Sequence, residues 1–221
     1  MRATTTDRPD QHAGTRRRTQ DERRATAETA LLDAASALVV ESGVGSLTLA
    51  RVGERAGYSR GIVTHHFGSK QALVDALARR VQAGYVTGLD AMAPGLERLL
   101  ALVEGYVALL SDATDANRAF LLLWVEAASA PELTPIFVER DAGFRAELCE
   151  DLAAGLADGT VAPDVDPADT AVAVVGQLRG IALQRLVDPA AVDADRLARV
   201  VAVQWRRALT GGAQGSSVGE R

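Results

Sequence analysis

The segment 48–70 concentrates polar and cationic side chains of the kinds that bind nucleic acids. Arg60 can donate two parallel hydrogen bonds to guanine O6 and N7, a contact that contributes about 1–3 kcal/mol of discrimination between bases. Lys70 is the only lysine in the chain, and its compact charge suits a phosphate group. The chemistry expected here is binding to double-stranded DNA, and the candidate contacts are Thr48, Ser59, Arg60, Gly61, Ile62, Thr64, His65, His66 and Lys70.

Several of these residues also fit other roles. Arg60 could contact a phosphate, which would position the protein without reading sequence. Ile62 could meet a thymine methyl group or could only pack within the protein. Thr48 and Ser59 fit helix N-caps, a role that is compatible with phosphate binding because helix N-termini attract anions. The sequence leaves the alternatives for Arg60 and Ile62 open.

Two short helices joined by a tight turn would place these side chains on one surface. Gly57 lies where the turn needs a positive φ, and Gly53 lies where two crossing helices must approach closely. Val52, Ala56 and Val63 supply small apolar contacts between the helices. This pattern predicts a helix-turn-helix over about 48–67, whose second helix enters the DNA major groove. That helix should turn Arg60, Gly61, Thr64 and His65 outward, and Val63 and Phe67 inward.

The adjacent histidines His65 and His66 could suggest a metal site. Neighbouring side chains on a helix point about 100° apart, so both cannot readily bind one ion. Cys149 is the only cysteine, and the third histidine, His12, lies far away in the sequence. We expect no metal and no cofactor. No nucleophile elbow or phosphate-binding glycine loop is present, so we also expect no enzymatic activity.

The composition indicates an all-α protein with a basic N-terminal part. The chain has 221 residues, of which 48% are hydrophobic and only 4% aromatic, and helix formers dominate. Residues 1–80 hold 13 Lys and Arg against 9 Asp and Glu, whereas residues 81–221 hold 11 against 20. This asymmetry indicates that only the N-terminal part meets a polyanion, unless the segregation arose by chance.

No segment of the sequence looks like a membrane or secretion signal. No apolar run approaches the ~18 residues that indicate a membrane span. The N-terminus has arginines but no apolar stretch of the kind found in secretory signals. A single cysteine fits a reducing compartment. We therefore expect a cytoplasmic protein without a membrane partner.

Capping signals predict four helices in the N-terminal part. Thr19 and Glu22 form a capping-box pattern that should start a helix running to about residue 42. Thr48, Ser59 and Ser69 are good N-caps for the next three helices. We expect residues 1–18 to be a disordered basic tail whose arginines could reach a minor groove, and residues 19–83 to form the DNA-binding domain.

The rest of the chain also reads as helical, with no strand pattern. Helices are expected over about 96–111 and 117–129. Two further helices are indicated by an N-cap residue followed by proline at the first helical position. The pairs are Thr134 with Pro135 and Asp166 with Pro167, and the helices should run to about residues 157 and 187. Asp193 should start the last helix. About nine helices result, with residues 84–210 as one helical domain and 211–221 as a flexible tail.

The N-terminal third resembles the tetracycline-repressor (TetR) family of bacterial regulators. The residues that fit the family pattern are Thr48, Ala56, Gly57, Ser59, Gly61, Phe67, Ser69, Lys70 and Leu73. Thr64 and His66 stand where the family often has tyrosine, so the phosphate contacts of those tyrosines must come from Thr64 and His66 or be absent. The resemblance implies a DNA-binding head joined to a variable helical domain for ligand binding and dimerisation.

Two features of the C-terminal domain fit that implication. Ala173, Gly176 and Gly180 would let another helix approach closely, and the resemblance implies that the last two helices pair with their copies in a homodimer. The same residues would also fit packing within one chain. The apolar stripe expected on the last helix is Leu197, Val200, Val201 and Trp205.

The expected effector is a largely apolar small molecule. Trp124 lies in the most hydrophobic run and should be near the pocket or in the adjoining core. Gln177 is the uncharged polar candidate for orienting a ligand. The acidic excess of this domain could also favour cationic apolar compounds.

The sequence as a whole predicts a ligand-responsive transcriptional regulator. We expect a repressor that binds an inverted-repeat operator as a dimer and is released by a small molecule. The alternative is a helical protein that binds a small molecule or a partner protein and has no role at DNA. Salt-sensitive binding to duplex DNA distinguishes the two hypotheses.

Overall fold

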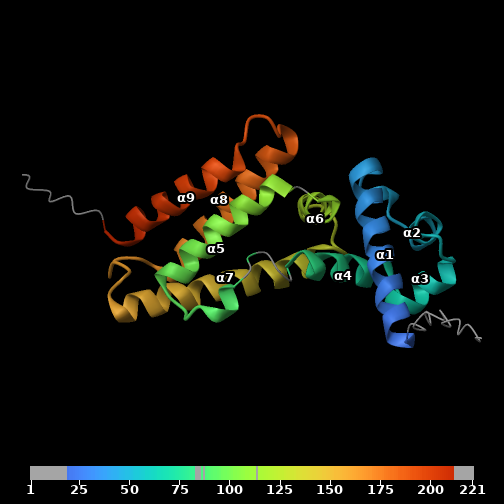
Figure 1. The fold of residues 1–221 in the computed structure, drawn as a ribbon, viewed down its shortest axis with the longest axis horizontal. Coiled ribbons are helices and arrows are strands. Elements are labelled where there is room, and N and C mark those ends of the chain that lie inside the picture. Colours follow the sequence, from blue (N-terminus) through green and yellow to red (C-terminus); the bar gives the residue numbers. More distant parts are fainter. Residues whose placement is uncertain (1–18, 83–85, 87, 113, 212–221) are drawn as a thin grey trace, which may run out of the picture.

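The computed structural model describes residues 19–82, 86, 88–112 and 114–211, and within them it contains helices and no strands (Figure 1). The predicted all-α fold is therefore confirmed for this part of the chain. The tail at 1–18 and the segment 212–221 lie outside the described residues, and so do the predictions of disorder made for them.

Four helices and a short 3₁₀ turn form the N-terminal part, residues 19–82, which we call the head. They are α1 (Gln20–Ser42), η1 (Val44–Ser46), α2 (Leu49–Ala56), α3 (Arg60–Phe67) and α4 (Lys70–Gln82). The capping box that opens α1 is confirmed, because the Thr19 amide donates to Glu22 and the Thr19 hydroxyl accepts from the Glu22 amide. The buried core of the head includes Leu31, Leu38, Val52, Val63, Leu73 and Leu77.

Five further helices form the C-terminal part, which we call the body. The elements are η2 (Leu89–Ala91), α5 (Leu96–Ala108), η3 (Leu109–Asp112), α6 (Asp115–Glu126), α7 (Thr134–Asp158), α8 (Pro167–Val187) and α9 (Ala194–Leu209). In Figure 1, α5 lies against α9, and α7 lies against α8. Asp166 and Asp193 cap α8 and α9 as predicted. No helix in the described ranges is long and apolar enough to cross a membrane.

Helix boundaries in the middle of the chain differ from the sequence predictions. The α-helix expected to reach residue 111 ends at Ala108 and continues as 3₁₀ turns. The next helix begins two residues early because Thr114 caps it. The prediction that Thr134 is an N-cap is wrong, since Leu133 holds that position. The Thr134 hydroxyl instead donates back to the carbonyl of Ala127 at 2.6 Å, which closes the tight connection between α6 and α7.

Helix α6 connects the head with the rest of the body. It packs along α1, contacts α4, and is contacted by α8 from the body side. The pKa of Arg55 on α2 is raised, with a hydrogen bond to Glu41 as the largest cause, and the charge of Asp115, at the first turn of α6, is the smallest of its causes. Helix α6 is therefore in direct contact with helices of both the head and the body.

A buried carboxylate anchors the start of α5. Asp151 on α7 is 1% exposed, accepts from the Gly95 amide at 3.0 Å, and accepts from Arg98 Nε at 2.6 Å. The hydrogen bond to Asp151 is the largest cause of the raised pKa of Arg98. Glu150 accepts from the same guanidinium at 3.2 Å but is exposed. Asp151 thus joins the N-terminus of α5 to α7.

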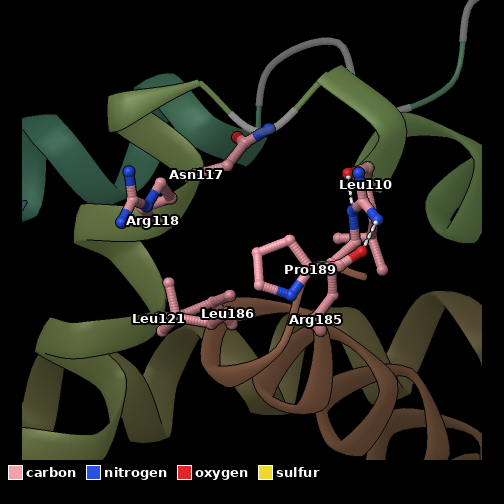
Figure 2. Close-up of a pocket in the computed structure, with 8 residues that line it drawn as sticks. Leu110, Asn117, Arg118, Leu121, Arg185, Leu186 and Pro189 are labelled. Carbon is pink, nitrogen blue, oxygen red and sulfur yellow. Dashed lines mark hydrogen bonds between the residues drawn. The ribbon is translucent and has the colours of Figure 1, made fainter. Parts of the chain in front are cut away.

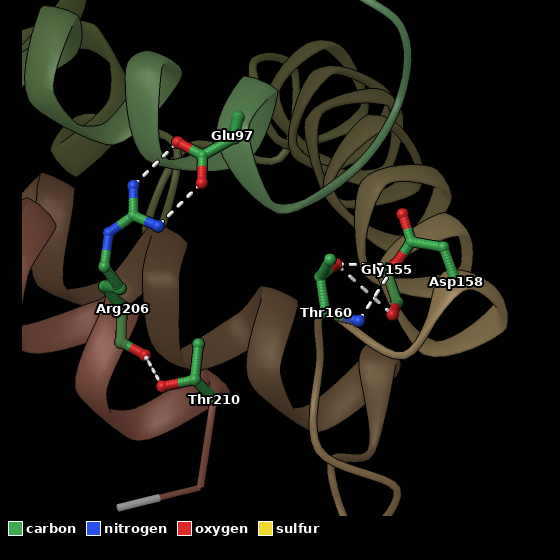
Figure 3. A network of polar contacts seen from close by, with 6 residues as sticks. All are labelled: Glu97, Gly155, Asp158, Thr160, Arg206 and Thr210. Atoms are coloured by element: carbon green, nitrogen blue, oxygen red, sulfur yellow. Dashed lines mark hydrogen bonds and ion pairs between the residues drawn. The ribbon is translucent and has the colours of Figure 1, made fainter.

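The same end of the body carries exposed polar contacts (Figure 3). Arg206 on α9 donates two hydrogen bonds to Glu97 on α5, at 2.6 and 2.7 Å, and this contact lowers the pKa of Glu97. The Thr160 hydroxyl donates to Asp158 at 2.6 Å, which holds the turn after α7. Because exposed ion pairs contribute little, the Arg206–Glu97 pair between α9 and α5 adds little to the stability of the fold.

Candidate nucleic-acid interface

The turn between α2 and α3 has the tight geometry that the glycines predicted. Gly57 adopts φ 75° and ψ 24°, a left-handed conformation that glycine adopts without strain. A Cβ atom on Gly53 would lie 2.8 Å from the Tyr58 carbonyl oxygen and 3.1 Å from a methyl group of Val63. The close helix approach at Gly53 is therefore confirmed, and it fixes the angle at which α3 leaves the turn.

Helix α3 presents a polar face to solvent and two apolar side chains, Val63 and Phe67, to the core. Val63 is fully buried and Phe67 is partly buried, as predicted. Ile62 is 40% exposed, so packing within the chain does not account for the whole side chain. The outward residues form one continuous surface, made of Arg60, Gly61, Thr64 and His65.

Besides Thr19 at the start of α1, three further helix N-termini of the head carry hydroxyl caps. Thr48 accepts from the Arg51 amide at 3.2 Å, Ser59 from the Ile62 amide at 3.3 Å, and Ser69 from the Ala72 amide at 3.1 Å. Each cap uses the hydroxyl oxygen as an acceptor, so the hydroxyl hydrogen is left to donate to a phosphate. Lys70 begins α4 directly after the third cap. These positions combine backbone N–H groups, hydroxyl donors and a charge.

Three candidate DNA contacts already form a hydrogen bond or a ring contact within α3. The Thr64 hydroxyl donates to the Arg60 carbonyl at 3.0 Å, so its hydrogen is already used inside the helix. The rings of His65 and His66 are 6.2 Å apart at 76° to each other. The described residues hold no group of three or more His, Cys, Asp or Glu that could bind a metal ion.

The net positive charge of the head is smaller than the count over residues 1–80 suggested. Residues 19–82 carry eight Lys and Arg against seven Asp and Glu, so most of the basic excess belongs to residues 1–18, outside the described part. Arg60 and Lys70 form no ion pair with any described residue, and their charges remain available. The cations that are neutralised pair as Arg55 with Glu41, Arg79 with Asp75, and Arg80 with Asp33.

Trp124 lies in a buried polar cluster of the body that the sequence did not reveal. Its indole Nε1 donates to Asp141 at 2.8 Å. The guanidinium of Arg179, which is 6% exposed, lies 5.9 Å from the Trp124 ring and donates to the Tyr106 hydroxyl at 2.8 Å. The carbon of the same guanidinium is 4.8 Å from the centre of the Phe120 ring. Such a cation–aromatic cluster orders the interior where α5, α6, α7 and α8 meet.

The structure places Gln177 at the contact between α8 and α9, and its proposed role toward a ligand stays a prediction. Its amide oxygen accepts from Trp205 Nε1 at 2.6 Å, and its amide nitrogen donates to Gln204 at 3.1 Å. Both partners belong to α9. The Gln177 side chain therefore joins α8 to α9 through both its amide oxygen and its amide nitrogen.

A pocket of about 170 Å³ opens between η3, α6 and the end of α8 (Figure 2). In this view, Arg118 and Leu121 stand across the pocket from Arg185, and Asn117 lies at its upper side. Neither Trp124 nor Gln177 lines it. The lining residues are Leu110, Asn117, Arg118, Leu121, Ala182, Arg185, Leu186 and Pro189.

Comparison with known families matches both parts of the chain. The model for bacterial regulatory proteins of the tetR family matches residues 31–77, which include α2 and α3. The model for the C-terminal part of BetI-type transcriptional repressors matches residues 95–210, more than half of the chain. The chain belongs to the TetR family. This TetR-family protein is a DNA-binding transcriptional regulator, and its relatives are regulators rather than enzymes.

Individual relatives of this TetR-family protein are distant. The HTH-type transcriptional regulator BetI 2 of Chromohalobacter salexigens is 25% identical over 170 residues, which cover 74% of this chain and 79% of the relative. The solved structure of NalD, the secondary repressor of the MexAB-OprM multidrug efflux pump in Pseudomonas aeruginosa, superposes with a TM-score of 0.69 at 24% identity, covering 85% of this chain and 98% of NalD. FadR from Bacillus subtilis, in complex with stearoyl-CoA, superposes with a TM-score of 0.69 at 18% sequence identity. The superposition covers 79% of this chain and 95% of FadR. These two solved structures therefore have the same fold as this chain.

Proposed function

We propose that this TetR-family regulator is a dimeric repressor that binds an inverted-repeat operator and is released by a small molecule. The observation that carries the proposal is the exposed polar face of α3, held by the tight turn at Gly53 and flanked by the capped helix starts. Residues 19–83 act as the DNA-binding domain and 84–210 as the ligand-binding and dimerisation domain. The proposed DNA contacts are the residues that the sequence predicted, among which Arg60 recognises a base and Lys70 binds a phosphate.

The outer face of α8 and α9 is the proposed dimer interface. Val172 is 57% exposed, Val200 54% and Val203 46%, so three valines of these two helices lie in solvent within one chain. A Cβ atom added at Gly176 would meet nothing within 4 Å. A smooth surface of valines and small residues suits close helix packing, and a two-fold axis would bring the same face of a second copy onto it.

Ligand release is proposed to act through α6. The helix contacts α1 and α4 of the head and also lines the pocket of the body. A ligand that favours one position of α6 over another would change the separation of the two recognition helices in the dimer. NalD is described as a repressor and FadR was solved with stearoyl-CoA, which supports repression and the binding of a largely apolar molecule.

Selection of bound sequences from random DNA duplexes tests the DNA-binding function. We expect an enriched inverted repeat whose half-sites lie about 34–36 Å apart, or a multiple of that distance. Affinity should fall steeply with added salt, because neutralised phosphates release counterions. Absence of any enriched repeat, together with salt-insensitive binding, would favour the alternative of a ligand-binding protein without a DNA role.

The variants Lys70→Ala and Arg60→Ala should distinguish a residue that only positions the protein on DNA from one that recognises the base sequence. Lys70→Ala is expected to weaken binding to all duplexes alike and to flatten the salt slope by about 1. Arg60→Ala is expected to relax preference at one base pair in each half-site, at a cost of about 1–3 kcal/mol. Repeating the selection with each variant checks both. If Lys70→Ala changed the preferred sequence and Arg60→Ala did not, the two roles would be reversed.

Val200→Glu should produce a folded monomer. Because the side chain is exposed in one chain, the substitution leaves the core unchanged, whereas each copy in a dimer loses about 1.5–3 kcal/mol of burial. We expect the dimer dissociation constant to rise at least about a hundredfold, measured by light scattering over a dilution series. Val138→Glu on α7 is the matched control, since Val138 is 59% exposed and lies outside this face. Equal dissociation of both variants would argue against the α8–α9 interface.

A further inference from the structure

The pocket between η3, α6 and α8 combines an apolar lining with positive charge. Five of its residues are apolar, namely Leu110, Leu121, Ala182, Leu186 and Pro189. The polar lining residues are Asn117, Arg118 and Arg185, and none of the eight is acidic. Its volume of about 170 Å³ is below the roughly 300–1,000 Å³ of pockets for drug-sized ligands, so an occupant must be small.

Arg185 is held rigidly without a negatively charged partner. Its guanidinium donates to four backbone carbonyls, which are neutral acceptors, and it makes no ion pair with any residue that the structure describes. The side chain is fixed in place, as Figure 2 shows for two of these contacts, yet its charge is not compensated. The acceptors are Leu110 at 2.5 Å, Val192 at 2.6 Å, Pro189 at 3.0 Å and Ser111 at 3.5 Å.

Arg118 supplies a second charge on the opposite side. Its side chain is exposed on α6, and among the described residues its guanidinium makes no hydrogen bond or ion pair. The amide of Asn117 lies beside it and can donate as well. A guanidinium of this kind is suited to bidentate binding of a carboxylate.

From this lining we infer that the pocket binds a small amphipathic monoanion, in which a carboxylate meets the guanidinium groups and an apolar part packs on the leucines. The inference rests on the proposed function, because it gives the effector a location and a chemical class. It differs from the cationic compounds that the acidic composition of residues 81–221 suggested. The charges that face this pocket are local and positive, whereas the carboxylates of the body lie outside its lining.

The position of the pocket explains how such a ligand would be sensed. Asn117, Arg118 and Leu121 occupy the first two turns of α6, the helix that packs along α1 and contacts α4. A carboxylate bound between Arg118 and Arg185 would draw the start of α6 toward the end of α8. Coupling of this kind typically changes affinity at the second site by roughly 5- to 150-fold.

Calorimetric titration of the full-length protein with four matched probes tests the inference. Hexanoate and benzoate supply the anion, and hexylamine and benzylamine supply the same apolar groups with a cation. We expect saturable binding of the carboxylates alone. Arg118→Glu should weaken carboxylate binding by about tenfold or more, because a charge-assisted hydrogen bond is lost and a repulsive charge is introduced. Arg145→Glu on α7, outside the lining, is the control and should bind like the wild type.

A second variant changes the shape of the pocket and leaves its charge unaltered. Leu186→Trp should fill the space and abolish carboxylate binding, while thermal melts confirm that each variant is folded. The inference is overturned if neither carboxylate binds saturably, if the amines bind as tightly, or if Arg118→Glu binds like the wild type. Operator affinity is measured separately. Arg118-dependent carboxylate binding without any effect on the operator would leave the site standing and would contradict ligand release.

Discussion

Gly53→Leu is expected to abolish sequence-specific DNA binding while the body remains folded. Even a Cβ atom at this position would lie 2.8 Å from the Tyr58 carbonyl oxygen, and a leucine side chain would enter the space of Val63. Leucine is a good helix former, so the loss would come from steric displacement of α3 rather than from helix propensity. Operator affinity should fall about a thousandfold or more, to the level of nonspecific binding, measured by fluorescence anisotropy.

Gly45→Leu is the matched control for this experiment. Gly45 lies in η1 of the same head, and a Cβ atom there would meet nothing within 4 Å. The variant should bind the selected operator like the wild type. Retained specific binding by Gly53→Leu would show that the orientation of α3 does not depend on the close approach at the turn.

Asp151→Ala is expected to destabilise the protein by about 3–5 kcal/mol, because it leaves Arg98 largely buried without its main partner. The side chain of Arg98 is only 19% exposed, and the Gly95 amide at the start of α5 would lose its acceptor as well. Since domains are typically stable by only about 5–15 kcal/mol, the loss should be plain in a urea or thermal melt.

Glu150→Ala provides an adjacent comparison on the same helix. Glu150 also accepts from Arg98, at 3.2 Å, but its side chain is 62% exposed. Exposed ion pairs contribute about 0–1 kcal/mol, so this variant should melt close to the wild type. Equal melting of the two variants would mean that burial of Asp151 does not govern the energetics of this contact.

Features set by neighbouring residues were predictable from the sequence. The caps at Thr19, Thr48 and Ser59 each bond to an amide three residues ahead, so the signal and the partner lie within one helical turn. The buried position of Val63 followed from helical periodicity in the same way. The candidate DNA contacts are local too, and their roles remain predictions.

Features set by distant residues were not predictable. Asp151 meets Arg98 across 53 positions, and Arg179 meets Tyr106 across 73, and no local pattern marks either pair. The hydrogen bonds of Gln177 to Trp205 and Gln204 on another helix also have no signal in the neighbouring sequence. The pocket likewise joins residues from three segments, and its two arginines carry no motif.

The packing of α6 against the head also bears on how the protein unfolds. Buried residues from Leu31 in α1 to Leu209 at the end of α9 form one continuous apolar core, with Phe120 and Leu123 of α6 inside it. The head has no separate core of its own that ends at α4. A fragment ending near residue 82 would leave uncovered the apolar sides of α1 and α4 that α6 shields, and such surfaces promote aggregation. We therefore expect the head and the body to unfold as one cooperative unit.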